Sequence, residues 1–299
     1  MRKSARRFGA TWIASGIMLL TGLLPFPARA VDLLPFDYIP APAGTSALLG
    51  YYVNGSSDSL DLDGTGKVAN SALDSHIFVA RLTHWEMFGE TPVAAQLILP
   101  FGGLEDGRLS GGPLNAPSGL FDPSLTLGFW PLNDPKNGRW IAVANYLTFP
   151  FGEHHPGQTL NVGDNRWRND LQVGFIQKLP HDFTLDLAAD YIVYGDDDEA
   201  GNGRQKLTQE PTVETFAWLA YNFDPGTWAA IGYYGSFGGR KSLNGSGNGF
   251  RTHFHQVRAA FSKFVKPDLQ LTGSLGHDLS VRGGFKQDYV LQLRILKLF

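Results

Sequence analysis

Apolar and polar residues alternate along the end of the chain. Tyr289, Leu293 and Ile295 fall on one face, whereas Gln292 and Arg294 fall on the other. An alternation with a period of two predicts a β-strand that has one apolar and one polar side. The same alternation recurs in most of the segments upstream, which indicates an all-β protein.

Turn signals divide the chain after residue 45 into twelve such segments. We expect strands at 46–54, 72–87, 93–101, 122–130, 139–149, 169–178, 183–194, 211–223, 227–238, 252–265, 269–279 and 287–299. Tight turns follow the even-numbered strands, and mostly long connections rich in Gly, Asn and Asp follow the odd-numbered ones. This sorting is typical of a transmembrane up-and-down antiparallel β-barrel, with short periplasmic turns and long outer loops. A soluble Greek-key sandwich has no reason to sort its loops by length.

The start of the chain predicts export. Basic residues between Arg2 and Arg7 precede an apolar stretch at 12–24 and a small-x-small sequence at 28–30. This order is typical of a secretory signal peptide. We therefore expect a signal peptide at 1–30, a periplasmic N-terminal segment at 31–45 and an outer-membrane barrel at 46–299.

Composition narrows the function. Removal of residues 1–30 takes away five basic residues and no acidic one, so the formal net charge of −3 becomes −8. A mildly acidic exported chain argues against nucleic-acid binding through a basic surface. Cysteine is absent, which excludes disulfides and thiolate metal sites. No apolar run after residue 30 approaches the roughly 18 residues of a membrane-spanning helix, so a membrane form has to be a closed barrel.

Large aromatic residues cluster where strands meet connections, and we expect two interfacial belts. The belt on the short-turn side comprises Trp85, Phe88, Trp130, Trp140, Phe183, Phe223, Trp228, Phe264 and Phe299. The belt on the long-loop side comprises Phe101, Phe149, Trp167, Tyr194, Phe237 and Phe250. The terminal Phe299 also resembles the signal that outer-membrane barrels present to their assembly machinery.

The polar faces of the strands line the lumen in this arrangement. The proposed lumen-lining residues are Arg81, Gln96, Asp186, Asp190, Glu214, Gln256, Arg258, Gln292 and Arg294. We expect the three arginines to meet the three acids across or along the lumen. Each charge is either a structural strut or a solute contact, and the sequence leaves both roles open.

Several long stretches resemble a known family. They include 37–45, Ala95–Gly102, Gly128–Asp134, Asn161–Trp167 and Gly284–Asp288. Together they resemble the transporter family named for the meta-pathway of phenol degradation, over nearly the whole mature chain. The resemblance implies an outer-membrane barrel for uptake of aromatic or other hydrophobic compounds, with no catalytic residues to carry over.

Other candidate chemistry is weaker. The pairs His154–His155 and His253/His255 have no third ligand at a recognisable spacing, and the acidic stretches 61–64 and 196–199 have no calcium-loop register. We expect no metal, no cofactor and no catalytic residue.

The sequence thus predicts a bacterial outer-membrane channel for passive uptake of small hydrophobic or aromatic solutes. The alternative is a structural or adhesive barrel without transport activity. Expected partners are outer-membrane lipid and lipopolysaccharide, the barrel-assembly machinery and a small-molecule solute, with no nucleic acid. The long loop 102–121 either folds into the mouth and narrows it or lies outside the barrel.

Overall fold

The computed structural model describes residues 24–25, 33–201 and 204–299. The predicted signal peptide at 1–30 lies outside the described residues except for β1 (Leu24–Pro25), which pairs in parallel with β11 (Leu160–Asn161). Within the described ranges, no helix has the length and apolar character needed to cross a membrane.

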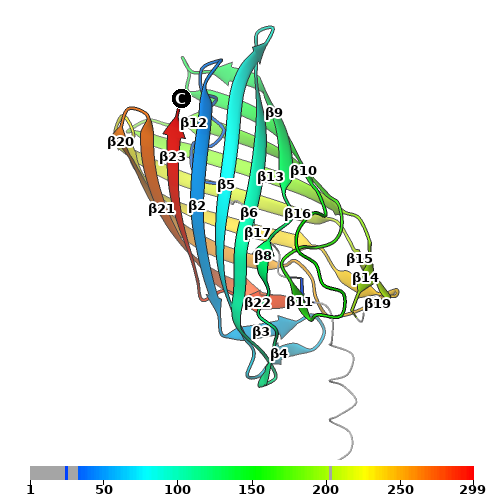
Figure 1. Cartoon of the computed structure of the whole chain (residues 1–299). Helices are drawn as coiled ribbons and strands as arrows, with labels where there is room; N and C mark the ends of the chain where they lie inside the picture. Colours follow the sequence, from blue (N-terminus) through cyan, green and yellow to red (C-terminus); the bar gives the residue numbers. More distant parts are fainter. Residues whose placement is uncertain (1–23, 26–32, 202–203) are drawn as a thin grey trace, which may run out of the picture.

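Twelve strands close into one antiparallel barrel (Figure 1). They are β2 (Ser46–Ser57), β5 (Ala72–Phe88), β6 (Thr91–Leu109), β9 (Ser124–Asp134), β10 (Arg139–Thr148), β12 (Arg168–Lys178), β13 (Phe183–Tyr194), β16 (Thr212–Asp224), β17 (Thr227–Gly238), β20 (Phe254–Lys266), β21 (Leu269–Val281) and β23 (Tyr289–Leu298). Neighbours in this order pair with each other, and β2 pairs with β23 from Ala47 opposite Leu298 to Ser56 opposite Tyr289. The predicted number of strands and the barrel are confirmed.

The short turns gather at the end of the barrel where the C-terminus lies (Figure 1). One of them is shorter than the sequence predicted, because β9 runs on to Asp134 before the chain turns. Asp134 lies opposite Arg139 of β10, and the Arg139 guanidinium lies 3.0 Å from the Asp134 carboxylate. This ion pair closes the hairpin, so the turn spans 135–138 rather than 131–138.

The long connections form small sheets at the opposite end. One sheet contains β3 (Ser59–Leu62), β4 (Gly66–Val68) and β22 (Gly284–Lys286). A second contains β14 (Asp197–Ala200), β15 (Gln205–Gln209), β18 (Lys241–Leu243) and β19 (Ser246–Gly247). The short strands β7 (Gly112–Pro113) and β8 (Ser118–Leu120) pair with the outer part of β6.

The loop predicted at 102–121 begins as regular structure. Strand β6 continues to Leu109, and its outer part pairs with β5. Leu104 is buried in an outer apolar cluster that also contains Leu60, Leu62, Leu73, Leu160 and Phe250. The first part of this segment is therefore held in a packed cap by apolar burial, which accounts for its strand conformation beyond the barrel wall.

Burial alternates along the strands as the sequence predicted. On β13, Leu187 and Tyr191 are exposed on the outer surface, whereas Asp186 and Asp190 are about 5% and 4% exposed. On β20, Val257 is exposed and Arg258 is buried. Apolar side chains thus face the lipid, and polar side chains face inward.

The aromatic belts are only partly as predicted. Phe88, Phe183 and Phe223 are exposed near the short turns, and Phe101 and Trp167 are exposed near the long loops. The predicted interfacial position is wrong for four residues. Trp130, Trp140 and Trp228 are buried inside the barrel, and Phe250 is buried in the outer cluster. The strand period sends these tryptophans inward, where a segment described below covers them.

The last residue pairs with the first barrel strand. The Phe299 N–H donates to the Ser46 carbonyl at 2.9 Å, and the Ser46 N–H donates to the Phe299 carbonyl at 3.2 Å, while the Phe299 side chain is 70% exposed. We predict that Phe299→Asp lowers the yield of heat-modifiable barrel in the outer membrane. The substitution leaves the main-chain pairing available, so a loss reports recognition of the side chain. Phe299→Tyr is the control and keeps normal yield; normal yield from Phe299→Asp contradicts the role of Phe299 as an assembly signal.

Candidate solute site in the barrel lumen

The chain before β2 enters the barrel. We call residues 33–45 the N-terminal segment. The sequence predicted a periplasmic segment at 31–45, but Leu34 and Tyr38 are only 1% and 6% exposed because barrel side chains surround them. The segment lies toward the short-turn end, where Phe36 and Pro40 line a cavity together with Leu179, Phe223 and other turn residues.

Several polar contacts fix this segment to the barrel wall, among them a hydrogen bond from the Tyr38 hydroxyl to Gln172. The indole N–H of Trp130 donates to the Tyr38 carbonyl at 2.7 Å, and that of Trp218 donates to the Leu33 carbonyl at 3.1 Å. The Phe36 N–H donates to the Asp186 carboxylate at 2.6 Å. Asp37 forms an ion pair with Arg294 at 2.6 Å, and both side chains are largely buried. Hydrogen bonds to charged groups contribute more than neutral ones, so Asp186 and Arg294 are the strongest of these anchors.

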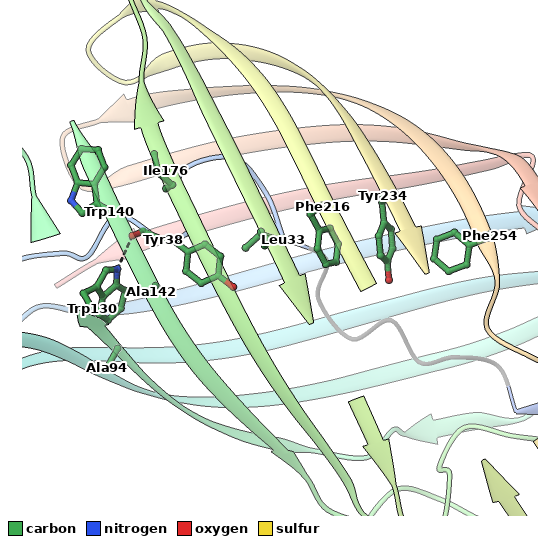
Figure 2. Packing of buried hydrophobic residues seen from close by; sticks show 11 residues of the cluster. Leu33, Tyr38, Ala94, Trp130, Trp140, Ala142, Ile176, Phe216, Tyr234 and Phe254 are labelled. Atoms are coloured by element: carbon green, nitrogen blue, oxygen red, sulfur yellow. Dashed lines mark hydrogen bonds between the residues drawn. The ribbon is translucent and has the colours of Figure 1, made fainter. Parts of the chain in front are cut away.

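Two glycines on the inner wall make room for aromatic rings. A Cβ placed on Gly174 would lie 2.0 Å from the Tyr38 ring, and one placed on Gly232 would lie 2.4 Å from the Trp218 ring. Figure 2 shows Tyr38 beside the wall and the Trp130 indole bonded to its carbonyl. The close approach of the ring to Gly174 thus seats the N-terminal segment.

We therefore predict that Gly174→Ala destabilises the barrel, because the methyl group and the Tyr38 ring occupy the same space. The expected cost is about 1–3 kcal/mol, typical of overpacking. In a Tyr38→Ala background the same substitution is expected to cost less than about 0.5 kcal/mol, since the clash is gone. Urea unfolding of the four proteins measures this coupling. An equal cost in both backgrounds contradicts the seating of Tyr38 on Gly174.

A cavity of about 130 Å³ lies in the lumen above the N-terminal segment. Its lining includes aromatic residues, namely Tyr38, Trp130, Phe216 and Tyr234, and polar residues, namely Arg81, Gln96, Asp170, Gln172, Asp190 and Glu214. Figure 2 shows Phe216, Tyr234 and Phe254 in a row on neighbouring strands. Their rings contact at centroid distances of 4.3 Å and 4.8 Å. The cavity thus offers aromatic faces beside polar groups.

The inner wall of the barrel combines apolar and polar side chains. Strands β2, β5 and β6 bury a group of aliphatic residues, which comprises Leu49, Val53, Ile77, Val79 and Ile98. Strands β12 to β21 bury the polar residues Gln172, Asp190, Gln256 and Asp278 together with aromatic residues such as Phe216 and Tyr234. A solute in this lumen therefore meets both apolar surfaces and hydrogen-bonding groups.

Three of the predicted lumen residues contact the N-terminal segment or lie close to it. Asp186 and Arg294 hold Phe36 and Asp37, as described above. Arg81 lines the cavity and donates to the Tyr51 hydroxyl at 3.5 Å. For Asp186 and Arg294, the sequence missed the partner, because the expected ion pairs joined strand to strand and the N-terminal segment supplies the partners instead.

The remaining predicted lumen residues also face inward. Gln172 donates to Asp190 at 2.9 Å, Tyr234 donates to Glu214 at 2.6 Å, and Gln256 donates to Asp278 at 2.7 Å. The Arg258 guanidinium lies 4.5 Å from the centre of the Tyr234 ring. Gln96 lines the cavity, and Gln292 is 2% exposed. Their part in solute contact remains a proposal.

The histidine pairs show no metal geometry. Across the described parts of the chain, no group of three or more His, Cys, Asp or Glu side chains is placed to hold a metal ion. His255 instead contacts the Tyr233 hydroxyl through Nδ1 at 2.7 Å, and its ring packs edge-on against Phe237.

The comparison with protein families identifies the chain's relatives. Residues 57–295 match the family described as "Putative MetA-pathway of phenol degradation". The chain belongs to this family. The match agrees with the resemblance drawn from the sequence and covers nearly the whole barrel. A search of curated proteins finds no match.

One solved structure supports this assignment. The crystal structure of an outer membrane channel from Pseudomonas putida F1 matches at a TM-score of 0.84 and 30% identity, over 90% of this chain and 100% of that one. The toluene transporter TbuX of Ralstonia pickettii matches at a TM-score of 0.47 and 10% identity, over 87% of this chain and 90% of that one. The NanC porin matches at a TM-score of 0.44 and 10% identity, over 85% of this chain and 98% of that one. The family and the first match place this family member in the bacterial outer membrane as a transmembrane β-barrel.

Proposed function

We propose that the protein is a channel for passive uptake of small hydrophobic or aromatic solutes. The observation that carries this proposal is the lumen cavity, in which aromatic side chains lie beside hydrogen-bonding groups. Apolar pockets with a few convergent polar groups are typical of small-molecule sites. The membership of the family named for phenol degradation, and the similarity to a Pseudomonas putida channel, support the same reading.

The size of the cavity supports a small solute. An engineered protein cavity of roughly 150 Å³ accepts benzene, and the cavity here has about 130 Å³. The N-terminal segment occupies the lumen below it, so axial passage requires that segment to shift. We infer that the structure corresponds to a closed channel.

Flux measurements test the channel. Refolded full-length protein in liposomes should admit phenol faster than a sugar of similar mass, because phenol has an aromatic ring for the aromatic side chains of the lumen and a hydroxyl for its hydrogen-bonding groups. Protein-free liposomes set the background rate of each solute. Absence of protein-dependent flux for every solute contradicts the channel and favours the structural barrel.

We further propose that the protein is not an enzyme, since the relative matched at 30% identity is a channel. A lipid-hydrolysis assay on the refolded barrel tests this, with no release of fatty acid expected. We also propose lipopolysaccharide and the barrel-assembly machinery as partners, for which the exposed Phe299 at the closing strand gives support.

A further inference from the structure

The outer end of the cavity carries buried positive charge. Arg166 and Lys241 are 3% and 6% exposed, and both line the cavity. Arg166 lies just before β12, and Lys241 begins β18 in the outer sheet. Both therefore lie beyond Arg168, at the end from which an external solute arrives.

Arg166 has donors to spare. Its Nη2 donates to Gln209 at 2.5 Å and lies 3.8 Å from the Asp164 carboxylate, and its guanidinium lies 4.9 Å from the centre of the Tyr194 ring. Its Nε and Nη1 atoms are buried and have no hydrogen-bond partner among the described residues. Buried donors are normally paired, and an unpaired one is costly. A bound acceptor would remove that cost.

Lys241 adds a second cation to this end of the cavity. The residue is buried, and no carboxylate of the described residues lies within ion-pair distance of its ammonium. Burial, and next the positive charge of Arg166, lower the pKa of Lys241 to about 7, against the opposing effect of Asp164. An anion placed between the two cations would stabilise the charged form of both.

Positive and negative side chains are unevenly placed along the cavity. Arg166, Arg168, Lys241 and Asp164 line its outer end, and Asp170 and Glu214 lie close enough to Arg168 to offset its charge. Asp164 is the acid that acts on Lys241. Arg166 and Lys241 together thus carry more positive charge than Asp164 offsets, which favours an anion beside them.

The cavity that these cations line has room for one aromatic ring. Tyr146, Ile192 and Phe216 line the same cavity, and its volume is close to that which accepts benzene. A ligand that carries both a carboxylate and one aromatic ring would use the cations and the aromatic faces together. Inorganic phosphate would use only the cations.

We propose that the outer end of the lumen cavity binds a monocyclic aromatic carboxylate, with the carboxylate on Arg166 and Lys241 and the ring against Tyr146 and Phe216. This assignment rests on the proposed channel function and narrows its solute class.

The binding test uses refolded full-length protein in detergent and isothermal titration at about pH 7. Benzoate, benzamide, acetate and inorganic phosphate are the probes. Benzoate should bind at least about tenfold more tightly than its neutral isostere benzamide, because charge-assisted hydrogen bonds are the stronger kind. It should also bind more tightly than acetate, which has no ring, and than phosphate.

Variants assign the effect to residues. Arg166→Gln should weaken benzoate binding roughly ten- to a hundredfold and leave benzamide binding unchanged. Lys241→Gln should weaken benzoate binding as well. Arg139→Gln, a matched change in an exposed ion pair at the short-turn end, should have no effect. Heat-modifiability on gels verifies that each variant is folded.

The pH dependence gives an independent readout. Bound carboxylate favours charged Lys241, so binding takes up a proton, and benzoate affinity should fall as the pH rises from about 6 to about 8. Arg166 and Asp164 are the charged groups that face the Lys241 ammonium. The pH dependence should disappear in Lys241→Gln.

The outcomes separate this assignment from the channel itself. Equal affinity for benzoate and benzamide, or an unchanged affinity in Arg166→Gln, overturns the carboxylate site even if phenol flux is normal. Equal affinity for acetate or phosphate overturns the aromatic part. Arg166-dependent benzoate binding without any solute flux supports the site and contradicts the channel.

Discussion

Deletion of residues 33–39 is expected to raise the single-channel conductance of the refolded protein several-fold. These residues fill the short-turn end of the lumen, and Leu34 and Tyr38 are almost completely buried there. Their removal leaves the main-chain pairing of all twelve barrel strands intact. The barrel should therefore fold while the part of the lumen that the N-terminal segment fills opens.

A milder variant should give a graded result. Asp37→Asn breaks the ion pair with Arg294 and leaves that guanidinium buried with a neutral partner, so the N-terminal segment should leave the lumen more often. Brief, frequent openings are expected in bilayer recordings. Asp268→Asn is the matched control, because Asp268 pairs with Lys297 at the rim of the barrel.

An unchanged conductance of the variant that lacks residues 33–39 would show that the outer cap, and not the N-terminal segment, limits passage.

Leu187→Arg should strongly destabilise the barrel. Leu187 lies in the middle of β13, and its side chain is exposed on the outer surface of the barrel. An arginine on the lipid face near the bilayer midplane costs about 2–4 kcal/mol. Folding into lipid vesicles at a series of urea concentrations measures this loss.

The neighbouring residue provides the control. Asp186 precedes Leu187 and faces inward. Asp186→Asn keeps a side-chain oxygen that can accept a hydrogen bond from the Phe36 N–H. We expect the barrel to remain folded with a small loss of stability. The face assignment fails if Asp186→Asn unfolds the barrel and Leu187→Arg does not.

The sequence predicted which side chains face the lumen better than it predicted their partners. Asp186 and Arg294 were placed on the inner face from the alternation alone, and both are buried there. Their partners were not predictable, because Phe36 and Asp37 reach them from a segment without any strand periodicity. One signal was present: Leu33, Leu34 and Phe36 are apolar residues that a solvated periplasmic segment would have no means to bury.

The tryptophans show that nearness to a strand end is not enough to predict an interfacial position. Trp130 and Trp228 lie near strand ends, where interfacial anchors are expected. Their inward orientation follows from the strand register, and it is stabilised by the N-terminal segment, to which Trp130 donates a hydrogen bond. Distance from the strand end alone could not distinguish a belt position from a lumen position.

The sequence alone determined the barrel, its strand number, the lipid and lumen faces and the sorting of loops, because these follow from local rules. The period of two fixes the face of each side chain, and Gly, Pro, Asn and Asp mark the turns. Only the tertiary structure decided what fills the lumen. The N-terminal segment, the outer apolar cluster and the Arg166–Lys241 pair bring together residues distant in the chain, and closure of the barrel alone decides which of them share the enclosed space.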